Sequence, residues 1–320
     1  YMIDNEETEN MAFHFWAAEP MLNQRVLFKC LAYIKDKLWV LNMKFDLSVN
    51  TNFTVLTDNI INKLSQYDIR INIWLDGNQE QNDSIRIDRN WKWTFNKIFE
   101  NINKTSKLWF NIGINLTLTD KNFDSISPKE FINIVKSLWV DSMLVDIDFI
   151  QWVKNNYIEV VNKLMEFQKL WDSEWIQMFW NRKAPFLNLT SEKWEEIVSF
   201  CHASKWKNLS VTPSQKLTFC TYSSNILTQL ENSNIQESFN NFVDNMKIYM
   251  NEKMLHNFCL GCCIEWICNW WCHVTHEQKT AIEYMCKIYK EATKELLKYY
   301  FWNADPDNEK EIISPSYNLD

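Results

Sequence analysis

Apolar and polar residues alternate with two different periods along the first half of the chain. Short apolar runs typical of buried strands occur at 12–16, 44–49, 69–75, 110–118 and 143–149. Between these runs, apolar residues recur every three to four positions, as on one face of a helix, at 23–37, 57–65, 94–103, 127–138 and 157–170. Repeated strand-then-helix units of about 30 residues predict an α/β fold, with parallel strands and helices packed outside them.

Polar loops follow the ends of three predicted strands. They lie at 17–20, 50–52 and 76–77. In a barrel of parallel strands the active site is built from the loops after the carboxyl ends of the strands. We therefore expect these three loops to contribute to one site.

Seven of the nine cysteines form a spaced set in the second half of the chain. They are Cys201, Cys220, Cys259, Cys262, Cys268, Cys272 and Cys286. The four from Cys259 to Cys272 are separated by two, five and three residues. Thiolates at this spacing cannot share one helix face or strand face, but they can surround a compact inorganic centre from a tight loop. Soft sulfur ligands favour zinc or an iron-sulfur cluster.

A disulfide framework and a zinc ribbon both fit the cysteines less well. Disulfide frameworks are typical of small secreted chains, whereas this chain has 320 residues and an odd number of cysteines. A zinc ribbon would need only four of the seven thiolates. Cys30 and Cys263 fall outside the spacing, and we expect them to be ordinary thiols.

Composition narrows the class of protein further. At 320 residues the chain is long enough for two domains or for one barrel with an extension, and its hydrophobic content of 46% supports a sizeable core. No apolar run reaches the roughly 18 residues of a membrane-spanning helix. A net charge of −8 disfavours a surface for nucleic acid or for an anionic membrane. Reduced thiols and no visible export signal predict a cytoplasmic protein.

The cysteine set resembles the signature of the SPASM domain. Cys201 and Cys220 bracket an alternating segment with a turn at 213–215, which predicts a hairpin that returns Cys220 towards Cys201. All the spacings fit the family's seven-cysteine pattern, although Gln215 stands where the family has glycine. The resemblance assigns Cys201, Cys220 and Cys272 to a first auxiliary 4Fe-4S cluster, and Cys259, Cys262, Cys268 and Cys286 to a second.

The strand-end loops resemble motifs of radical S-adenosylmethionine (SAM) enzymes. Ala17-Ala18-Glu19-Pro20 is similar to the family's Gly-Gly-Glu-Pro, which holds the amino group of SAM, and Asn50-Thr51-Asn52 is similar to its Thr-Asn-Gly. Asp76-Gly77, followed by Asp83 and Arg86, is similar to its Ser-Leu-Asp-Gly and Asp-x-x-Arg. The resemblance implies that Ala17, Ala18, Glu19, Pro20, Asn50, Thr51, Asn52 and Asp76 bind SAM.

The same resemblance implies the domain organisation. We expect a partial (β/α)6 radical SAM barrel at 1–190, a small SPASM domain with a β-hairpin and a C-terminal helix at 191–302, and a polar tail at 303–320. The family's radical-generating Cys-x3-Cys-x2-Cys is absent from these residues. We expect that motif and its 4Fe-4S cluster in a missing N-terminal segment. Alanines replace the two glycines at 17 and 18, and Trp74 occupies a position that is small in relatives.

The resemblance implies a ribosomal peptide maturase. Such an enzyme uses a 5′-deoxyadenosyl radical to abstract hydrogen from a peptide or protein substrate, and receives electrons from a donor such as flavodoxin or ferredoxin. An anaerobic sulfatase-maturating enzyme is an alternative that Thr221 disfavours, because those relatives have a catalytic aspartate there. A non-enzymatic iron-sulfur or peptide-binding protein is a further alternative. The sequence identifies no catalytic residue, and Asp76 and Asp83 are of types that often form turns.

Glycine is rare in the chain and tryptophan is abundant. There are 3 glycines and 17 tryptophans, whereas glycine usage is ordinarily about 7%. Several tryptophans stand at expected helix ends or turns, where glycine is favoured: Trp39, Trp91, Trp93, Trp109, Trp139, Trp171, Trp270 and Trp271. We hypothesise that many of these are glycines in the native protein, because its host reads the UGA codon as glycine. The alternative is a naturally tryptophan-rich protein.

Overall fold

The computed structural model describes most of the chain. The described residues are 10–16, 18–88, 90–108, 110–140, 142–148, 156–174, 177–180, 183–191, 208–212, 214–220, 228–231, 233–253, 262–268 and 279–302. Ala17, Trp109, Cys201, Thr221, Cys259, Trp270, Trp271 and Cys272 lie outside them. Within this part of the chain, no helix has the length and apolar character needed to cross a membrane.

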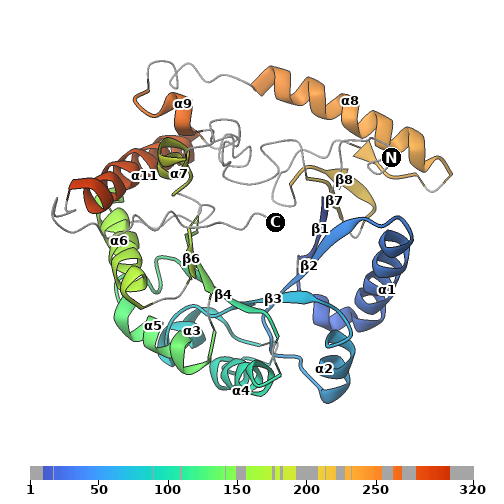
Figure 1. Ribbon diagram of the computed structural model, residues 1–320, viewed down its shortest axis with the longest axis horizontal. Helices are drawn as coiled ribbons and strands as arrows, with labels where there is room; N and C mark the ends of the chain where they lie inside the picture. Colours follow the sequence, from blue (N-terminus) through green and yellow to red (C-terminus); the bar gives the residue numbers. More distant parts are fainter. Residues whose placement is uncertain are drawn as a thin grey trace.

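Six parallel strands form one sheet in chain order. They are β1 (Asn10–Phe15), β2 (Lys44–Thr51), β3 (Ile69–Trp74), β4 (Ile112–Leu118), β5 (Ser142–Ile147) and β6 (Gln177–Phe179). Each strand pairs with the next in parallel register. In Figure 1 the strands form an open arc with α1, α2, α4 and α6 along its outside. The predicted α/β fold is confirmed, and β6 adds a three-residue strand after the five predicted apolar runs.

Helices accompany the strands of the sheet, and some of them, including α2 and α5, begin at residues whose side chains cap the helix. They are η1 (Pro20–Asn23), α1 (Gln24–Val40), α2 (Asp58–Leu64), α3 (Gln79–Ile85), α4 (Phe95–Ser106), α5 (Pro128–Ser137), α6 (Tyr157–Glu174) and α7 (Ala184–Thr190). The Thr57 hydroxyl accepts from the Ile60 amide at the start of α2, and the Ser127 hydroxyl accepts from the Glu130 amide at the start of α5. These bonds satisfy amides that lack helical partners.

Alternation along the strands gives the sheet two different faces. In β3 the side chains of Ile69, Ile71 and Ile73 are buried in the main core, beneath the helices. The intervening Arg70 and Asn72 therefore point to the other face, inside the arc, because successive strand residues face opposite sides. Strand register places Ser48, Asn50, Gly113, Asn115 and Ser142 on the same inner face. The inside of the arc is thus polar, whereas its outside is apolar.

The second half of the chain forms a smaller assembly beside the sheet. It contains β7 (Ser210–Val211), β8 (Lys216–Thr218), β9 (Thr228–Gln229), α8 (Ile235–Lys253), α9 (Glu265–Cys268), α11 (Lys279–Leu297) and the π-helix η4 (Lys298–Trp302). The predicted hairpin is confirmed, because β7 and β8 pair antiparallel around the turn. Its Leu217 and Phe219 pack with Phe242 and Met246 of α8 in a separate small core. The predicted domain boundaries stay predictions.

The C-terminal helix α11 joins this assembly to the main core. Ile288, Tyr289 and Leu296 are fully buried among the side chains that cover the sheet. The Tyr300 hydroxyl of η4 donates to Asp172 Oδ2 of α6 over 2.7 Å. Thus α11 and η4 are fixed to the outside of the barrel, while α8 and α9 lie on the open side of the arc (Figure 1).

Candidate functional site

Glu19 joins the ends of the first two strands. Its Oε1 accepts hydrogen bonds from the Met21 amide (2.9 Å) and from the Thr51 hydroxyl (2.7 Å). Its Oε2 accepts from the Asn52 amide at 2.7 Å. A carboxylate has about four lone-pair sites, so one acceptor position remains on Oε2. Glu19, Thr51 and Asn52, which the sequence predicts to lie in one site, are therefore adjacent.

The loops around Glu19 have a strained backbone. Ala18 has a φ of 51° and Phe53 a φ of 56°, in the left-handed region that favours glycine. The turn after β2 is fixed by Asn52, whose Oδ1 accepts from the amide (3.0 Å) and the hydroxyl (2.8 Å) of Thr54. Ala18 thus has a conformation that favours glycine, at a position where the sequence resembles a glycine-containing motif. Pro20 begins η1 directly after Glu19.

Asn50 has a different neighbourhood from Glu19. Its Oδ1 accepts from Asn72 Nδ2 of the next strand at 2.9 Å. Asn72 Oδ1 in turn accepts from Arg70 Nε at 3.1 Å, and Arg70 Nη2 donates to Ser142 Oγ at 3.0 Å. Gly113 leaves room for this row, because a Cβ at 113 would lie 3.0 Å from Asn72 Oδ1 and 3.2 Å from Arg70 Nη2. Asn50 therefore belongs to a polar row across the inner face of the sheet.

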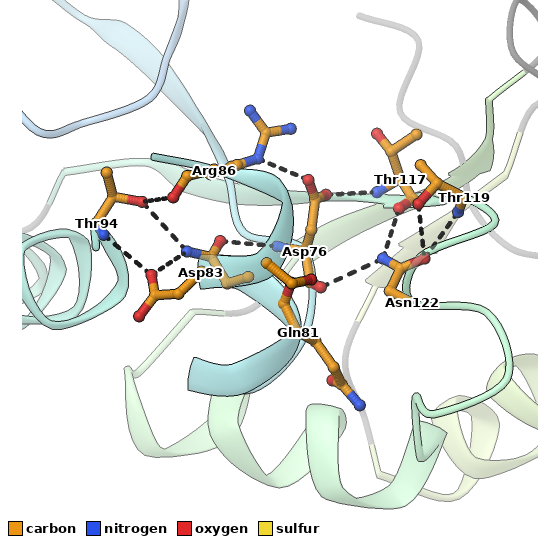
Figure 2. A network of polar contacts seen from close by, with 10 residues as sticks. Asp76, Gln81, Asp83, Arg86, Thr94, Thr117, Thr119 and Asn122 are labelled. Atoms are coloured by element: carbon orange, nitrogen blue, oxygen red, sulfur yellow. Dashed lines mark hydrogen bonds and ion pairs between the residues drawn. The ribbon is translucent and has the colours of Figure 1, made fainter. Parts of the chain in front are cut away.

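Asp76 occupies the centre of a second network, at the ends of β3 and β4 (Figure 2). Its Oδ2 contacts Arg86 Nε at 2.6 Å, and its Oδ1 accepts from the Thr117 amide at 2.9 Å. The backbone of Asp76 also donates to Asn82 Oδ1 and accepts from Asn122 Nδ2. Burial raises the pKa of Asp76, and Arg86 and the Thr117 amide offset part of that effect.

Asp76 holds Arg86 in place rather than presenting its own carboxylate. Each oxygen of Asp76 accepts one hydrogen bond, and the residue is only 1% exposed, so solvent and ligands have little access to its carboxylate. The Arg86 guanidinium lies over the Trp74 ring, 5.4 Å from its centroid, and its terminal nitrogens point away from Asp76 (Figure 2). The sequence motif included Arg86, but only the structure shows that Arg86 is the exposed residue of the Asp76–Arg86 ion pair.

Asp83 lies within α3 and caps the next helix, so it does not form the turn that its residue type suggested. Its Oδ1 accepts from the amides of Thr94 (3.0 Å) and Phe95 (2.9 Å) at the start of α4. This arrangement resembles an N-terminal cap supplied from another helix. Asp83 therefore links α3 to α4, and its carboxylate supports the loop that carries Arg86.

Four of the seven predicted cysteine ligands are described. Cys220 follows β8, Cys262 precedes α9, Cys268 ends α9, and Cys286 lies in α11. All four are half-buried thiols that pack against the main core. Within the described ranges no three His, Cys, Asp or Glu side chains come close enough to hold one metal ion. Since Cys201, Cys259 and Cys272 are outside those ranges, the two ligand sets stay predictions.

Lys290 shows that two of these thiols have a common neighbour. Burial lowers the pKa of Lys290, but Cys262, Cys263 and Cys286 outweigh that effect, so that the net pKa is raised. Cys286 and Lys290 are one turn apart on α11. Cys262, before α9, and Cys286, on α11, therefore both lie near Lys290.

Comparison with known proteins identifies the fold of the chain more clearly than it identifies a sequence family. No family model matches the chain. An uncharacterized protein of Methanocaldococcus jannaschii, MJ0907, is 25% identical over 168 residues, or 52% of this chain and 55% of that protein. A cysteine-type anaerobic sulfatase-maturating enzyme of Clostridium novyi is 31% identical over 120 residues, or 37% of this chain and 31% of that enzyme. This chain thus matches about half of the first relative and a third of the second.

Solved structures match over most of the chain. The structure of anSMEcpe with bound AdoMet and Kp18Cys peptide has a TM-score of 0.69 at 14% identity, covering 92% of this chain and 87% of that one. Streptococcus suis SuiB bound to S-adenosylmethionine has a TM-score of 0.59 at 13% identity, covering 85% and 64%. The chain has the fold of the radical SAM/SPASM peptide maturases.

In this radical SAM/SPASM fold, the described loops lie at the carboxyl edge of the sheet. Glu19 follows β1, Thr51 ends β2 with Asn52 directly after it, and Asp76 follows β3. These are the strand ends at which parallel barrels build their sites. The predicted partial barrel with a β-hairpin and a C-terminal helix is confirmed. The assignment of individual residues to SAM and to clusters goes beyond the fold.

Proposed function

We propose that the chain belongs to a radical SAM/SPASM enzyme that modifies a peptide or protein substrate. The observation that carries the proposal is the position of Glu19, whose carboxylate ties together the ends of β1 and β2 in a fold shared with AdoMet-bound structures. Such a carboxylate suits a ligand ammonium, because charge-assisted hydrogen bonds are about twice as strong as neutral ones.

The described residues offer charged partners for the amino-acid part of SAM, which carries an ammonium and a carboxylate on one carbon. Oε2 of Glu19 keeps an acceptor position for the amino group of SAM, beside the backbone of Asn52. Arg86 presents its terminal nitrogens away from Asp76, and a guanidinium matches a carboxylate in geometry and charge. When bound beside a reduced 4Fe-4S cluster, SAM supplies hydrogen abstraction by radical chemistry. The residues of this chain bind SAM, orient it and exclude water.

The cysteine region would hold two auxiliary clusters. We assign Cys201, Cys220 and Cys272 to the first, and Cys259, Cys262, Cys268 and Cys286 to the second. The half-burial of Cys220, Cys262, Cys268 and Cys286 against the main core supports this assignment. An electron donor such as flavodoxin or ferredoxin would serve these clusters, and the peptide would bind between them and the inner face of the sheet.

Anaerobic production of the complete open reading frame tests this function. We expect the protein with its reconstituted iron to release 5′-deoxyadenosine from SAM under reducing conditions. Replacing Glu19 with glutamine is expected to raise the SAM dissociation constant by about tenfold or more, since a charged hydrogen bond contributes roughly 1.5–3 kcal/mol. Glu100→Gln is the matched control, because Glu100 is exposed on α4. Iron-loaded protein that neither binds SAM nor releases 5′-deoxyadenosine would contradict the proposal.

A sulfatase-maturating function is the second candidate. The Clostridium novyi sulfatase-maturating enzyme, at 31% identity over 120 residues, favours it, and anSMEcpe has a similar fold. Thr221, which disfavours it, lies outside the described residues. Incubation with a sulfatase-derived peptide separates the candidates, because a mass change at the cysteine of that peptide identifies the maturase. A change confined to a peptide encoded beside this gene identifies the ribosomal peptide maturase.

A further inference from the structure

Two exposed tryptophans have a backbone conformation that favours glycine. Trp91 and Trp139 each have a φ of 58°, and their exposed fractions are 82% and 86%. A left-handed residue with a side chain costs roughly 1–2 kcal/mol, because its Cβ approaches the following carbonyl oxygen. Neither indole is buried, so packing does not offset that cost.

The hydrogen bonds at Trp139 make it the glycine position of a helix end. α5 ends at Ser137, and its C-cap is Leu138. The amide of Trp139, the next residue, donates to the carbonyl of Lys136 at 3.0 Å. That bond is one of the pair that defines the Schellman motif, whose left-handed residue is usually glycine.

Trp91 occupies the position of a hairpin turn at which glycine is normally found. Its amide donates to the Asp88 carbonyl at 3.1 Å, and the Asp88 amide donates to the Lys92 carbonyl at 2.9 Å. This is a β-turn followed by a left-handed residue, the G1-bulge arrangement in which that residue is normally glycine. Gln215 has the same pattern with Thr212 and Lys216, at a φ of 59°.

Other tryptophans differ in conformation, so the pattern is not a property of the residue type. Trp39 is 79% exposed but lies within α1, and the left-handed residue after that helix is Asn42. Trp171 is 3% exposed and lies within α6 rather than after it. The prediction of a left-handed helix end is therefore wrong for Trp39 and Trp171 and confirmed for Trp139.

We propose that the native protein carries glycine at positions 91 and 139. The proposal rests on backbone geometry and exposure, independently of the proposed function. A chain with 3 glycines keeps one at Gly77, whose φ is 117° and where a Cβ would lie 2.2 Å from Gln81 Oε1. The host would read the UGA codon as glycine, whereas the amino-acid sequence has UGA translated as tryptophan. That difference accounts for exposed tryptophans at the two left-handed positions.

Peptide mass spectrometry of the protein from its native host decides the question. We expect glycine in the peptides that contain positions 91 and 139, and UGA at both codons. Tryptophan in either peptide would overturn the proposal for that position. The measurement requires no folding of a variant, so a loss of stability cannot obscure it.

A matched set of variants tests the geometry on which the proposal rests. Position 139 and position 39 share the tripeptide Leu-Trp-Val, but only the first is left-handed. We expect Trp139→Gly to raise the folded-to-unfolded ratio roughly fivefold over Trp139→Ala, because alanine retains the Cβ. At position 39 we expect the reverse, with Trp39→Ala roughly threefold above Trp39→Gly. Equal stabilities of the Trp139→Gly and Trp139→Ala variants would refute the left-handed conformation assigned to position 139.

Discussion

The rim of the barrel and the cysteine region position their functional groups by different means. At the rim, Glu19 and Asp76 are each fixed by several hydrogen bonds, including one to a residue of a neighbouring strand. In the cysteine region, the described thiols come from separate elements: the end of β8, the two ends of α9, and α11. Hydrogen bonds can preorganise a carboxylate without a ligand, whereas thiols on separate elements are held together by a metal. The rim should thus be complete before cofactors bind.

The largest expected effect is a loss of bound iron when a cysteine of the cysteine region is replaced. Replacing Cys262 or Cys286 with serine should remove about half of the auxiliary iron, because each is assigned to the second of two clusters. Iron and sulfide content, measured with visible absorption, checks this. Cys30→Ser is the control, since Cys30 lies in α1 outside the cysteine set. Equal iron content in all three variants would contradict the ligand assignment.

The rim should respond instead to loss of a single ion-pair partner. Asp76→Ala leaves Arg86 without the carboxylate that accepts its Nε proton at 2.6 Å. Breaking a buried pair costs roughly 3–5 kcal/mol, and Arg86 is 27% exposed, so we expect a loss of about 2–3 kcal/mol. Urea denaturation measures it, with Asp36→Asn on the exposed side of α1 as the control. An unchanged midpoint for Asp76→Ala would show that the pair does not organise the rim.

Short-range patterns explain which parts of the fold could be predicted. Strand alternation at 69–74 and the caps Thr57 and Ser127 are local signals, and the structure bears them out. β6 escaped prediction because three residues carry no periodicity, and α3 because it is short and polar despite the Asn78 and Gln81 capping box. α6 continues to Glu174 because Trp171 is buried within it.

The candidate site was predictable in its residues but not in its contacts. The motifs indicated Glu19, Thr51, Asn52 and Asp76, and the structure places the first three together. It separates Asn50, whose partner is Asn72 on the adjacent strand. The inner-face row of Arg70, Asn72 and Ser142 went unnoticed because it depends on register across strands distant in the sequence. Alternation in β3 was the signal that could have indicated it.

The smallest expected effect is a pH dependence of stability that arises from Lys183. This residue lies where η4, at the end of the cysteine region, packs on α6 of the barrel, a contact that needs no metal. Lys183 is 5% exposed; its Nζ donates to Gln168 Oε1 at 3.4 Å and lies 5.5 Å from the Tyr300 ring centroid. Burial lowers the pKa of Lys183, and Asp172 offsets only part of that effect. The folded protein therefore releases this proton at a lower pH than the unfolded chain does.

That difference fixes the sign of a pH dependence. Because the unfolded chain binds more protons between the lowered pKa and the ordinary value of 10.5, stability should rise with pH across that window. Lys183→Met should abolish the rise and stabilise the protein at neutral pH, since no ammonium is then buried. Urea midpoints from neutral to alkaline pH measure the effect, with Lys129→Met on exposed α5 as the control. If the urea midpoint of Lys183→Met rises with pH as steeply as that of the wild type, the packing of η4 on α6 does not depend on this buried charge.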